Sequence, residues 1–254
     1  MSLSLQLRAE AELNPWLARL DPRARLLLAL LFAATVVSLQ QPLTLLVALG
    51  GALALALASG LRPALLLKRL LALEGFMLVL VLMLPFSVPG EPLFQLGPLS
   101  ASGAGLERAL VILLKANAVV VALLTLAGTL EPIVFGHALA RLGVPDKLVH
   151  LLLFTLRYVD LLFAEYQRLR LAMRARAFAP ASNGHTWRSY GYLIGMLLVR
   201  SLERAQRIQA AMKCRGFNNR LLLVDASRWQ GADSRFLLLA TLGLAALLLL
   251  ERWQ

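Results

Sequence analysis

Two short segments of the chain carry cations in nearly the same sequence context. AMRARAF occupies residues 172–178, and AMKCRGF occupies residues 211–217. In each segment an Arg stands three residues after a Met and is followed by a small residue and a Phe. The two arginines are Arg176 and Arg215. A guanidinium stays charged and offers a planar set of donors that suits carboxylate or phosphate. The repeat therefore predicts two matched sites that recognise an acidic group.

The neighbours of the two arginines strengthen this interpretation. A single Arg at a helix end is usually a solvated charge that favours the helix dipole, whereas two copies in matched context favour a shared binding role. Small residues flank each Arg and would let a partner approach the backbone: Ala175, Ala177, Cys214 and Gly216. Phe178 and Phe217 are predicted to fill an apolar cleft beside the charged contact, as interface anchors do. Cys214 is interpreted as a small residue of the motif rather than as a redox thiol.

The two segments are expected to end two long helices. Pro145-Asp146 begins a stretch with few helix breakers before Pro180, and a turn at residues 181–184 precedes a second helix from about His185 to Phe217. In both stretches apolar residues recur every three or four positions, as on one face of an α-helix. The predicted stripes contain Leu148, Leu152, Val159, Leu162, Leu169 and Met173 in the first helix, and Ile194, Leu197, Ser201, Ala205, Ile208 and Met212 in the second.

These helices would be stiff rods outside the membrane. We expect them to cross, to pack along their stripes and to present Arg176 and Arg215 together. The stretch from Glu131 to Arg235 contains 16 Lys and Arg against 7 Asp and Glu, so it holds most of the chain's net charge of +12. Such an excess of cations is typical of a segment on the cytoplasmic side of a membrane.

The remainder of the chain is typical of an integral membrane protein. Of its 254 residues, 59% are hydrophobic and 16% are charged, and the mean hydropathy is +0.72. A span needs about 20 mainly apolar residues. The sequence predicts five spans, at Leu26–Leu39, Leu43–Leu61, Ala72–Leu84, Ala109–Thr129 and Phe236–Leu250. Cations alternate between the intervening loops so that the N-terminus is predicted to be cytoplasmic.

Three polar residues fall within the predicted third and fourth spans, and polar groups there suggest a function. They are Glu74, Lys115 and Asn117. Glu74 is close to the cytoplasmic end of its span, where a side chain can reach the membrane interface. Lys115 and Asn117 are deeper, and we expect them to contact Glu74 or a second membrane subunit.

Several kinds of chemistry are not indicated by the sequence. It contains no Walker A pattern, so ATP hydrolysis by this chain is not expected. His137, His150 and His185 stand apart from any cluster at metal-ligand spacing, and we expect no metal site, no cofactor and no nucleic-acid partner. Two alternatives stay open at this stage. One is a membrane-embedded enzyme that acts on lipid phosphates, and the other is a self-sufficient channel or carrier.

The same residues carry a family resemblance. The stretch GYLIGMLLVRSLERAQRIQAAMKCRGF resembles the end of the transmembrane T component of energy-coupling factor (ECF) transporters, and its cobalt-type CbiQ-like members above all. LARLDPRARLL resembles the opening of that family, and LLLFTLRYVDLLFAEYQRLRLAMRARAF resembles its first coupling helix. The resemblance spans most of the chain and is most specific over residues 145–217.

The resemblance implies a fold and a function. The fold would be all-α: N-terminal membrane helices at 1–130, coupling helices at 131–234 and a last span at 235–254. In that family two X-Arg-X motifs dock into grooves on two ABC-type ATPase subunits; here they would be Ala175-Arg176-Ala177 and Cys214-Arg215-Gly216. Ala177 departs from the commoner Gly, which makes the turn after Arg176 less permissive.

The resemblance also implies partners, cargo and location. The chain would be a non-catalytic subunit in the inner (cytoplasmic) membrane of a bacterium, joining the ATPases to a membrane-embedded substrate-capture subunit. Cobalt(II) would be the cargo and would be bound by the capture subunit, with nickel or a vitamin such as biotin as the alternatives.

Overall fold

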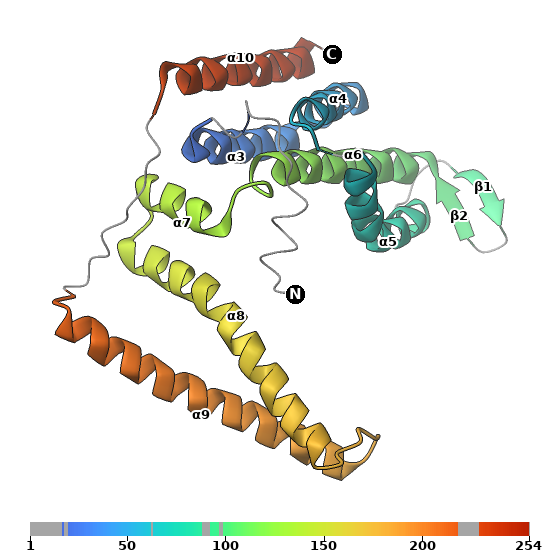
Figure 1. The fold of residues 1–254 in the computed structure, drawn as a ribbon. Coiled ribbons are helices and arrows are strands. Elements are labelled where there is room, and N and C mark those ends of the chain that lie inside the picture. Colours follow the sequence, from blue (N-terminus) through green and yellow to red (C-terminus); the bar gives the residue numbers. More distant parts are fainter. Residues whose placement is uncertain are drawn as a thin grey trace. The chain divides into compact units, whose positions relative to one another are not determined.

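A computed structural model describes residues 17, 20–61, 63–87, 92–96, 99–217 and 229–253. The described chain is helical apart from one short β-hairpin (Figure 1). It divides into two compact units, and each is described by itself. One unit is built on Leu139–Asp225, and the other on Ala9–Ala138 together with Ala226–Gln254. The division at 1–130, 131–234 and 235–254 stays a prediction.

Each of the five predicted spans coincides with one helix of the second unit. These helices are α3 (Pro22–Ser38), α4 (Pro42–Ala58), α5 (Pro63–Ser87), α6 (Gly103–Leu126) and α10 (Gly231–Trp253). Among the described residues, α6 and α10 are long and apolar enough to cross a membrane, and α4 is a shorter apolar helix of 17 residues. The structure therefore supports a membrane protein with two candidate spans, and the number five stays a prediction.

The helix starts in this unit follow from local sequence. Proline stands in the first turn of α3 and α4, where its fixed φ fits and its missing N–H costs nothing. The carboxylate of Asp21 caps α3 by accepting from the Arg23 N–H at 3.0 Å. The hydroxyl of Ser102 caps α6 in the same way, from the Gly105 N–H at 3.1 Å.

Helix α6 forms the centre of this unit and packs against α3, α4 and α5. Most of its buried residues are small or β-branched, including Ala118, Val121 and Ala122. Small side chains let helix backbones approach closely, which is how helices associate in lipid, where no hydrophobic force draws them together. Helix α10 packs against α3 and α4.

The predicted all-α fold class is confirmed in the described residues, although a short hairpin was missed in the expected loop between the third and fourth spans. Strand β1 (Pro92–Leu96) pairs antiparallel with β2 (Leu99–Ser102), and Leu96 lies opposite Leu99. The strands have five and four residues. Segments this short carry too little periodicity to be distinguished from a loop rich in Pro, Gly and Ser.

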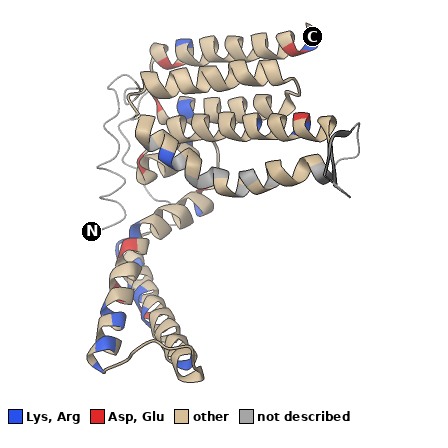
Figure 2. Cartoon of the chain, turned by 90° about the vertical axis from the view of Figure 1, so that its right-hand side faces the viewer, with Lys and Arg blue, Asp and Glu red and all other residues tan. Residues whose placement is uncertain are grey.

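The other unit is a pair of long antiparallel helices. Helix α7 (Pro132–Arg141) precedes it, and α8 (Asp146–Ala175) and α9 (Gly184–Cys214) contain 30 and 31 residues. Asn183 caps α9 by accepting from the Thr186 N–H at 2.9 Å. The two long helices predicted from the sequence are therefore present, with boundaries within a few residues of those expected. Lys and Arg are spread along this pair (Figure 2).

Candidate functional site

The first heptamer ends α8 in a defined hydrogen-bonded turn. The Phe178 N–H donates to the carbonyl of Met173 at 3.1 Å, and the Ala177 N–H donates to that of Arg174 at 3.0 Å. This pair of contacts is the Schellman motif, which satisfies carbonyls at the end of a helix. It requires a residue in the left-handed region, and Ala177 supplies it with φ of 58°.

The second heptamer ends α9 in the same way. The Phe217 N–H donates to the Met212 carbonyl at 3.0 Å, and the Gly216 N–H donates to the Lys213 carbonyl at 3.0 Å. Gly216 takes the left-handed position with φ of 74°. The two heptamers therefore have one backbone structure as well as one sequence pattern.

This geometry shows that most residues of each heptamer serve to end the helix, whereas the Arg does not. The small residue after each Arg permits the positive φ, and the Met and the Phe occupy the positions whose side chains meet in a Schellman motif. Arg176 and Arg215 occupy the same cap position, with φ and ψ of −92° and 23° in one case and −89° and 11° in the other. Both arginines are exposed. Ending a helix requires no guanidinium, so the repeated Arg points to an external contact.

The two arginines do not lie together, which corrects the expectation from the sequence. The loop after α8 is short, and the Phe178 ring packs against Tyr190 in the second turn of α9, with centroids 5.9 Å apart. The end of α8 therefore lies beside the start of α9, and Arg215 lies at the far end of α9 (Figure 1). A helix of this length rises about 45 Å, so the two guanidiniums are separated by roughly that distance.

A charge pair with a buried carboxylate and a half-exposed guanidinium joins the two helices between these ends. Arg200 of α9 donates to the carboxylate of Glu165 on α8, and Arg168 lies 3.5 Å from the same carboxylate. Only 9% of Glu165 is exposed. Sequence reasoning missed this pair. A signal was available, because Glu165 is the only carboxylate between residues 161 and 202 in an Arg-rich stretch.

The face of α8 that meets α9 differs from the predicted stripe. The groove between the helices is lined on α8 by Phe154, Tyr158, Leu161, Leu162 and Glu165, so that only Leu162 belongs to the stripe. Leu148 and Val159 of that stripe are exposed. On α9 the prediction was better, since the groove is lined by Leu197, Ser201, Ala205, Ile208 and Met212. The groove has a volume of about 620 Å³.

Both phenylalanines that follow the arginines make contacts inside this unit. Phe178 packs against His185 and Tyr190, and Phe217 lines the groove. Each is half-buried, so only part of each ring is available to a partner. Their role as anchors in a partner's cleft stays a prediction. Cys214 is an exposed free thiol.

A family model matches most of the chain. Residues 14–223 match the family model described as CbiQ, cobalt transport protein. The chain belongs to the CbiQ family. The matched range contains both heptamers and ends before α10.

Named relatives of this CbiQ-family chain are transporter components. It is 28% identical over 243 residues to the energy-coupling factor transporter transmembrane protein EcfT of Listeria innocua, covering 89% of this chain and 90% of the relative. It is 28% identical over 214 residues to EcfT of Brevibacillus brevis, covering 80% of each. It is 30% identical over 151 residues to the cobalt transport protein CbiQ of Rhodobacter capsulatus, covering 58% of this chain and 62% of the relative.

Two of the three polar residues predicted to lie within the spans have local partners in this CbiQ-family chain. The Lys115 ammonium donates to the Val37 carbonyl at 3.0 Å, at the end of α3. The Asn117 amide donates to the Leu113 carbonyl of its own helix at 3.1 Å. The Glu74 side chain lies outside the described part of the chain. The proposed contacts with a second membrane subunit stay predictions.

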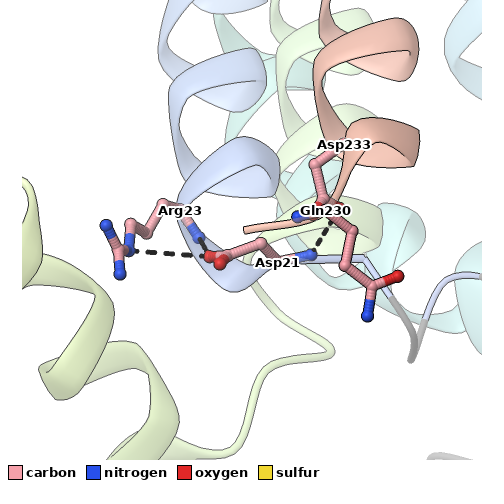
Figure 3. Close-up of polar contacts among 4 residues, drawn as sticks. All are labelled: Asp21, Arg23, Gln230 and Asp233. Carbon is pink, nitrogen blue, oxygen red and sulfur yellow. Dashed lines mark hydrogen bonds and ion pairs between the residues drawn. The ribbon is translucent and has the colours of Figure 1, made fainter. Parts of the chain in front are cut away.

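A buried carboxylate that sequence reasoning missed holds the start of α10 (Figure 3). Asp233 is 1% exposed. Its two oxygens accept from the Asp21 N–H at 2.8 Å and from the Gln230 N–H at 2.8 Å. Asp21 in turn lies 3.7 Å from the Arg23 guanidinium. At the other end of α10, Glu251 accepts from the N–H groups of Gln40 and Gln41. Polar contacts therefore tie both ends of α10 to the neighbouring helices.

The described residues contain no group of three or more His, Cys, Asp or Glu side chains arranged to hold a metal ion. The candidate site of this chain rests on the repeated helix ends at Arg176 and Arg215, which α9 separates.

The strained turn at Ala177 leads to a prediction about the stability of the helix end. Left-handed backbone costs a residue with a side chain about 1–2 kcal/mol, and glycine escapes this cost. Ala177→Gly should raise hydrogen-exchange protection of the Phe178 amide about fivefold or more. Gly216→Ala should lower protection of the Phe217 amide by a similar factor. Equal protection in both variants and the parent would contradict the left-handed turn.

The charge pair between the helices leads to a pH prediction. The hydrogen bond from Arg200 holds the pKa of the Glu165 carboxyl below its ordinary value of 4.5, and the charges of Arg200, Arg168 and Arg204 add to this effect. A depressed pKa in the folded state means that the unfolded chain takes up the proton first as the pH falls. The stabilising contribution is therefore complete above the ordinary pKa and is lost as the pH falls through the lowered one.

Spin labels on α8 and α9 can measure this change. With labels at the exposed positions Phe163 and Met196, the distance distribution should be narrow at neutral pH. It should broaden as the pH falls through the lowered pKa of Glu165, which lies below 4.5. Glu165→Gln should give the broad distribution at both pH values. A parent distribution that is unchanged on acidification would show that the pair does not hold the helices.

Proposed function

We propose that this chain is the transmembrane coupling subunit of an ECF-type ABC importer. Two separate ABC-type ATPase subunits dock on Arg176 and Arg215, and their movement passes through α8 and α9 to a membrane-embedded substrate-capture subunit. The observation that carries the proposal is the repeated helix end. One backbone turn is used twice, and each time it exposes one guanidinium at the end of a stiff helix.

The separation of the two arginines supports two docking partners. Guanidiniums held roughly 45 Å apart by an α-helix cannot enter one groove together. They can each enter a groove on one of two subunits placed side by side. A planar guanidinium pairs with a carboxylate through two parallel hydrogen bonds, so acidic residues are the expected lining of each groove.

The chain itself is proposed to hydrolyse no ATP. Its sequence has no Walker A pattern, so the energy has to come from the docked subunits. In this account the chain is a mechanical link, and the charge pair of Glu165 and Arg200 keeps its two helices in one arrangement.

Cobalt(II) is the proposed cargo. The support is the family description as cobalt transport protein and the CbiQ relative of Rhodobacter capsulatus. The EcfT relatives carry no cargo in their names, and nickel or a vitamin such as biotin is the alternative. The proposed location is the inner (cytoplasmic) membrane of a bacterium, with the N-terminus on the cytoplasmic side, in keeping with the distribution of Lys and Arg.

Purification of the native complex tests this proposal. Affinity purification of the tagged chain from native membranes should recover ABC-type ATPase subunits and a second membrane protein. Liposomes that contain this whole complex should accumulate radiolabelled cobalt(II) only when ATP is supplied. Liposomes that contain the chain alone should show no flux. Flux through the chain alone would make it a carrier, and recovery without any ATPase would contradict the coupling role.

A further inference from the structure

The two docking ends differ in their charge. When the heptamers are aligned, Arg168 matches Arg207, Arg174 matches Lys213 and Arg176 matches Arg215, but Arg170 matches Gln209. Residues 166–176 therefore contain four cations, and the matching residues 205–215 contain three. Residues 166–176 contain four arginines and no carboxylate.

The additional cation forms a like-charged pair on the outer face of α8. Arg170 and Arg174 are four residues apart and both are exposed. Like charges at this spacing lie side by side on a helix and destabilise it. Helical spacing places Arg170 about 140° around α8 from Glu165, which faces α9, so the pair points away from α9.

The part of the chain that the structure describes provides no counter-charge for this pair. Within the described part of the chain, no carboxylate lies within ion-pair distance of Arg170, Arg174 or Arg176, and Glu165 is already paired with Arg168 and Arg200. Like-charge repulsion is smaller at the Arg215 end of α9. There Glu203 lies 3.9 Å from Arg207, and the neutral Gln209 lines the groove.

We propose that the ATPase surface receiving the Arg176 end carries a second acidic patch that binds Arg170 and Arg174. The inference rests on the proposed function and adds to it. Arg170 lies about 9 Å from Arg176 along the helix axis, so one protein surface can contact both. Because the Arg215 end lacks this contact, the Arg176 end binds its ATPase more tightly and with a steeper dependence on salt.

The test isolates one docking end at a time. The full complex is reconstituted in nanodiscs with the ATPase subunits recovered from native membranes. In the Arg215→Glu variant only the Arg176 end can bind an ATPase subunit. In the Arg176→Glu variant only the Arg215 end can do so. In the Arg215→Glu background, Arg170→Gln should weaken ATPase binding about threefold at low salt and flatten its salt dependence. In the Arg176→Glu background, Arg170→Gln should change nothing.

A matched control and the lipid composition distinguish the outcomes. Arg157→Gln removes the same charge from an exposed position of α8 far from the end, and it should leave ATPase binding unchanged. An Arg170→Gln effect no larger than that of Arg157→Gln would overturn the inference. The inference would also be overturned if Arg170→Gln had an effect in nanodiscs that contain phosphatidylglycerol and none in nanodiscs of phosphatidylcholine alone. Arg170 and Arg174 would then bind lipid. Full ATPase binding in both single-end backgrounds would instead remove the proposed function itself.

Discussion

Changing both Arg176 and Arg215 to Glu should strip the ATPase subunits from membranes that contain this chain. Each change replaces a guanidinium with a carboxylate opposite an acidic groove. Loss of one partner from a desolvated charge pair costs about 2–5 kcal/mol. Since about 1.4 kcal/mol is a factor of ten in affinity, each end should lose at least about 30-fold. The measurement is the amount of ATPase that remains with washed membranes, at matched amounts of the chain.

The control for this change is a double substitution with the same charge difference elsewhere on the helices. Arg157 and Arg188 are exposed, and neither lies at a helix C-terminus. Changing both to Glu should leave ATPase retention close to that of the parent. Thermal unfolding in detergent should be similar for the two double variants, because all four side chains are exposed. ATPase that stays on the Arg176→Glu, Arg215→Glu membranes would count directly against docking through these ends.

Asp233→Ala should lower the free energy of unfolding of the unit that contains α3 to α6 and α10. The Asp233 carboxylate is buried and accepts from two backbone N–H groups, those of Asp21 and Gln230. An alanine leaves both donors without their acceptor, and a buried unsatisfied polar group costs about 1–3 kcal/mol. The total expected loss is about 2–4 kcal/mol, which thermal unfolding of the purified chain in detergent can measure.

Two further variants test whether this loss comes from the buried acceptor. Asp233→Asn keeps one acceptor oxygen and should lose about half as much. Ser234→Ala removes the neighbouring side chain, whose hydroxyl accepts from the exposed Trp229 indole at 2.8 Å, and should be nearly neutral. Similar midpoints for the parent and Asp233→Ala would show that α10 is held by apolar packing instead.

Local rules in the sequence were sufficient to locate the helices. Proline at helix starts, long apolar runs and the three-to-four spacing are local properties, and they placed α3, α4, α6, α8, α9 and α10 close to their observed positions. The hairpin of β1 and β2 was missed because each strand is too short to show its period. The repeated heptamer was recognised from the sequence. Its Met, small residue and Phe form the hydrogen-bonded turn that ends each helix. Only the Arg remains as a signal of binding.

These local rules do not determine where two helices lie relative to each other or which faces they pack through. The two arginines were expected side by side, although a loop of about eight residues between long helices favours an antiparallel pair whose C-terminal ends point in opposite directions. The face of α8 was predicted wrongly because α8 carries apolar residues on more than one face, with Leu148, Leu151 and Val159 exposed. The contact between Glu165 and Arg200, which is tertiary, selects the face that meets α9.

The most direct test of the account is a photo-cross-linking experiment in native membranes. A benzophenone amino acid at Ala175 or at Cys214 places the reactive group next to each arginine and leaves the guanidinium in place. We predict that illumination joins an ABC-type ATPase subunit to the chain from each of the two positions, and that Arg176→Glu and Arg215→Glu abolish the adduct at their own end. Adducts with lipid alone, or with the membrane-embedded subunit alone, would contradict it.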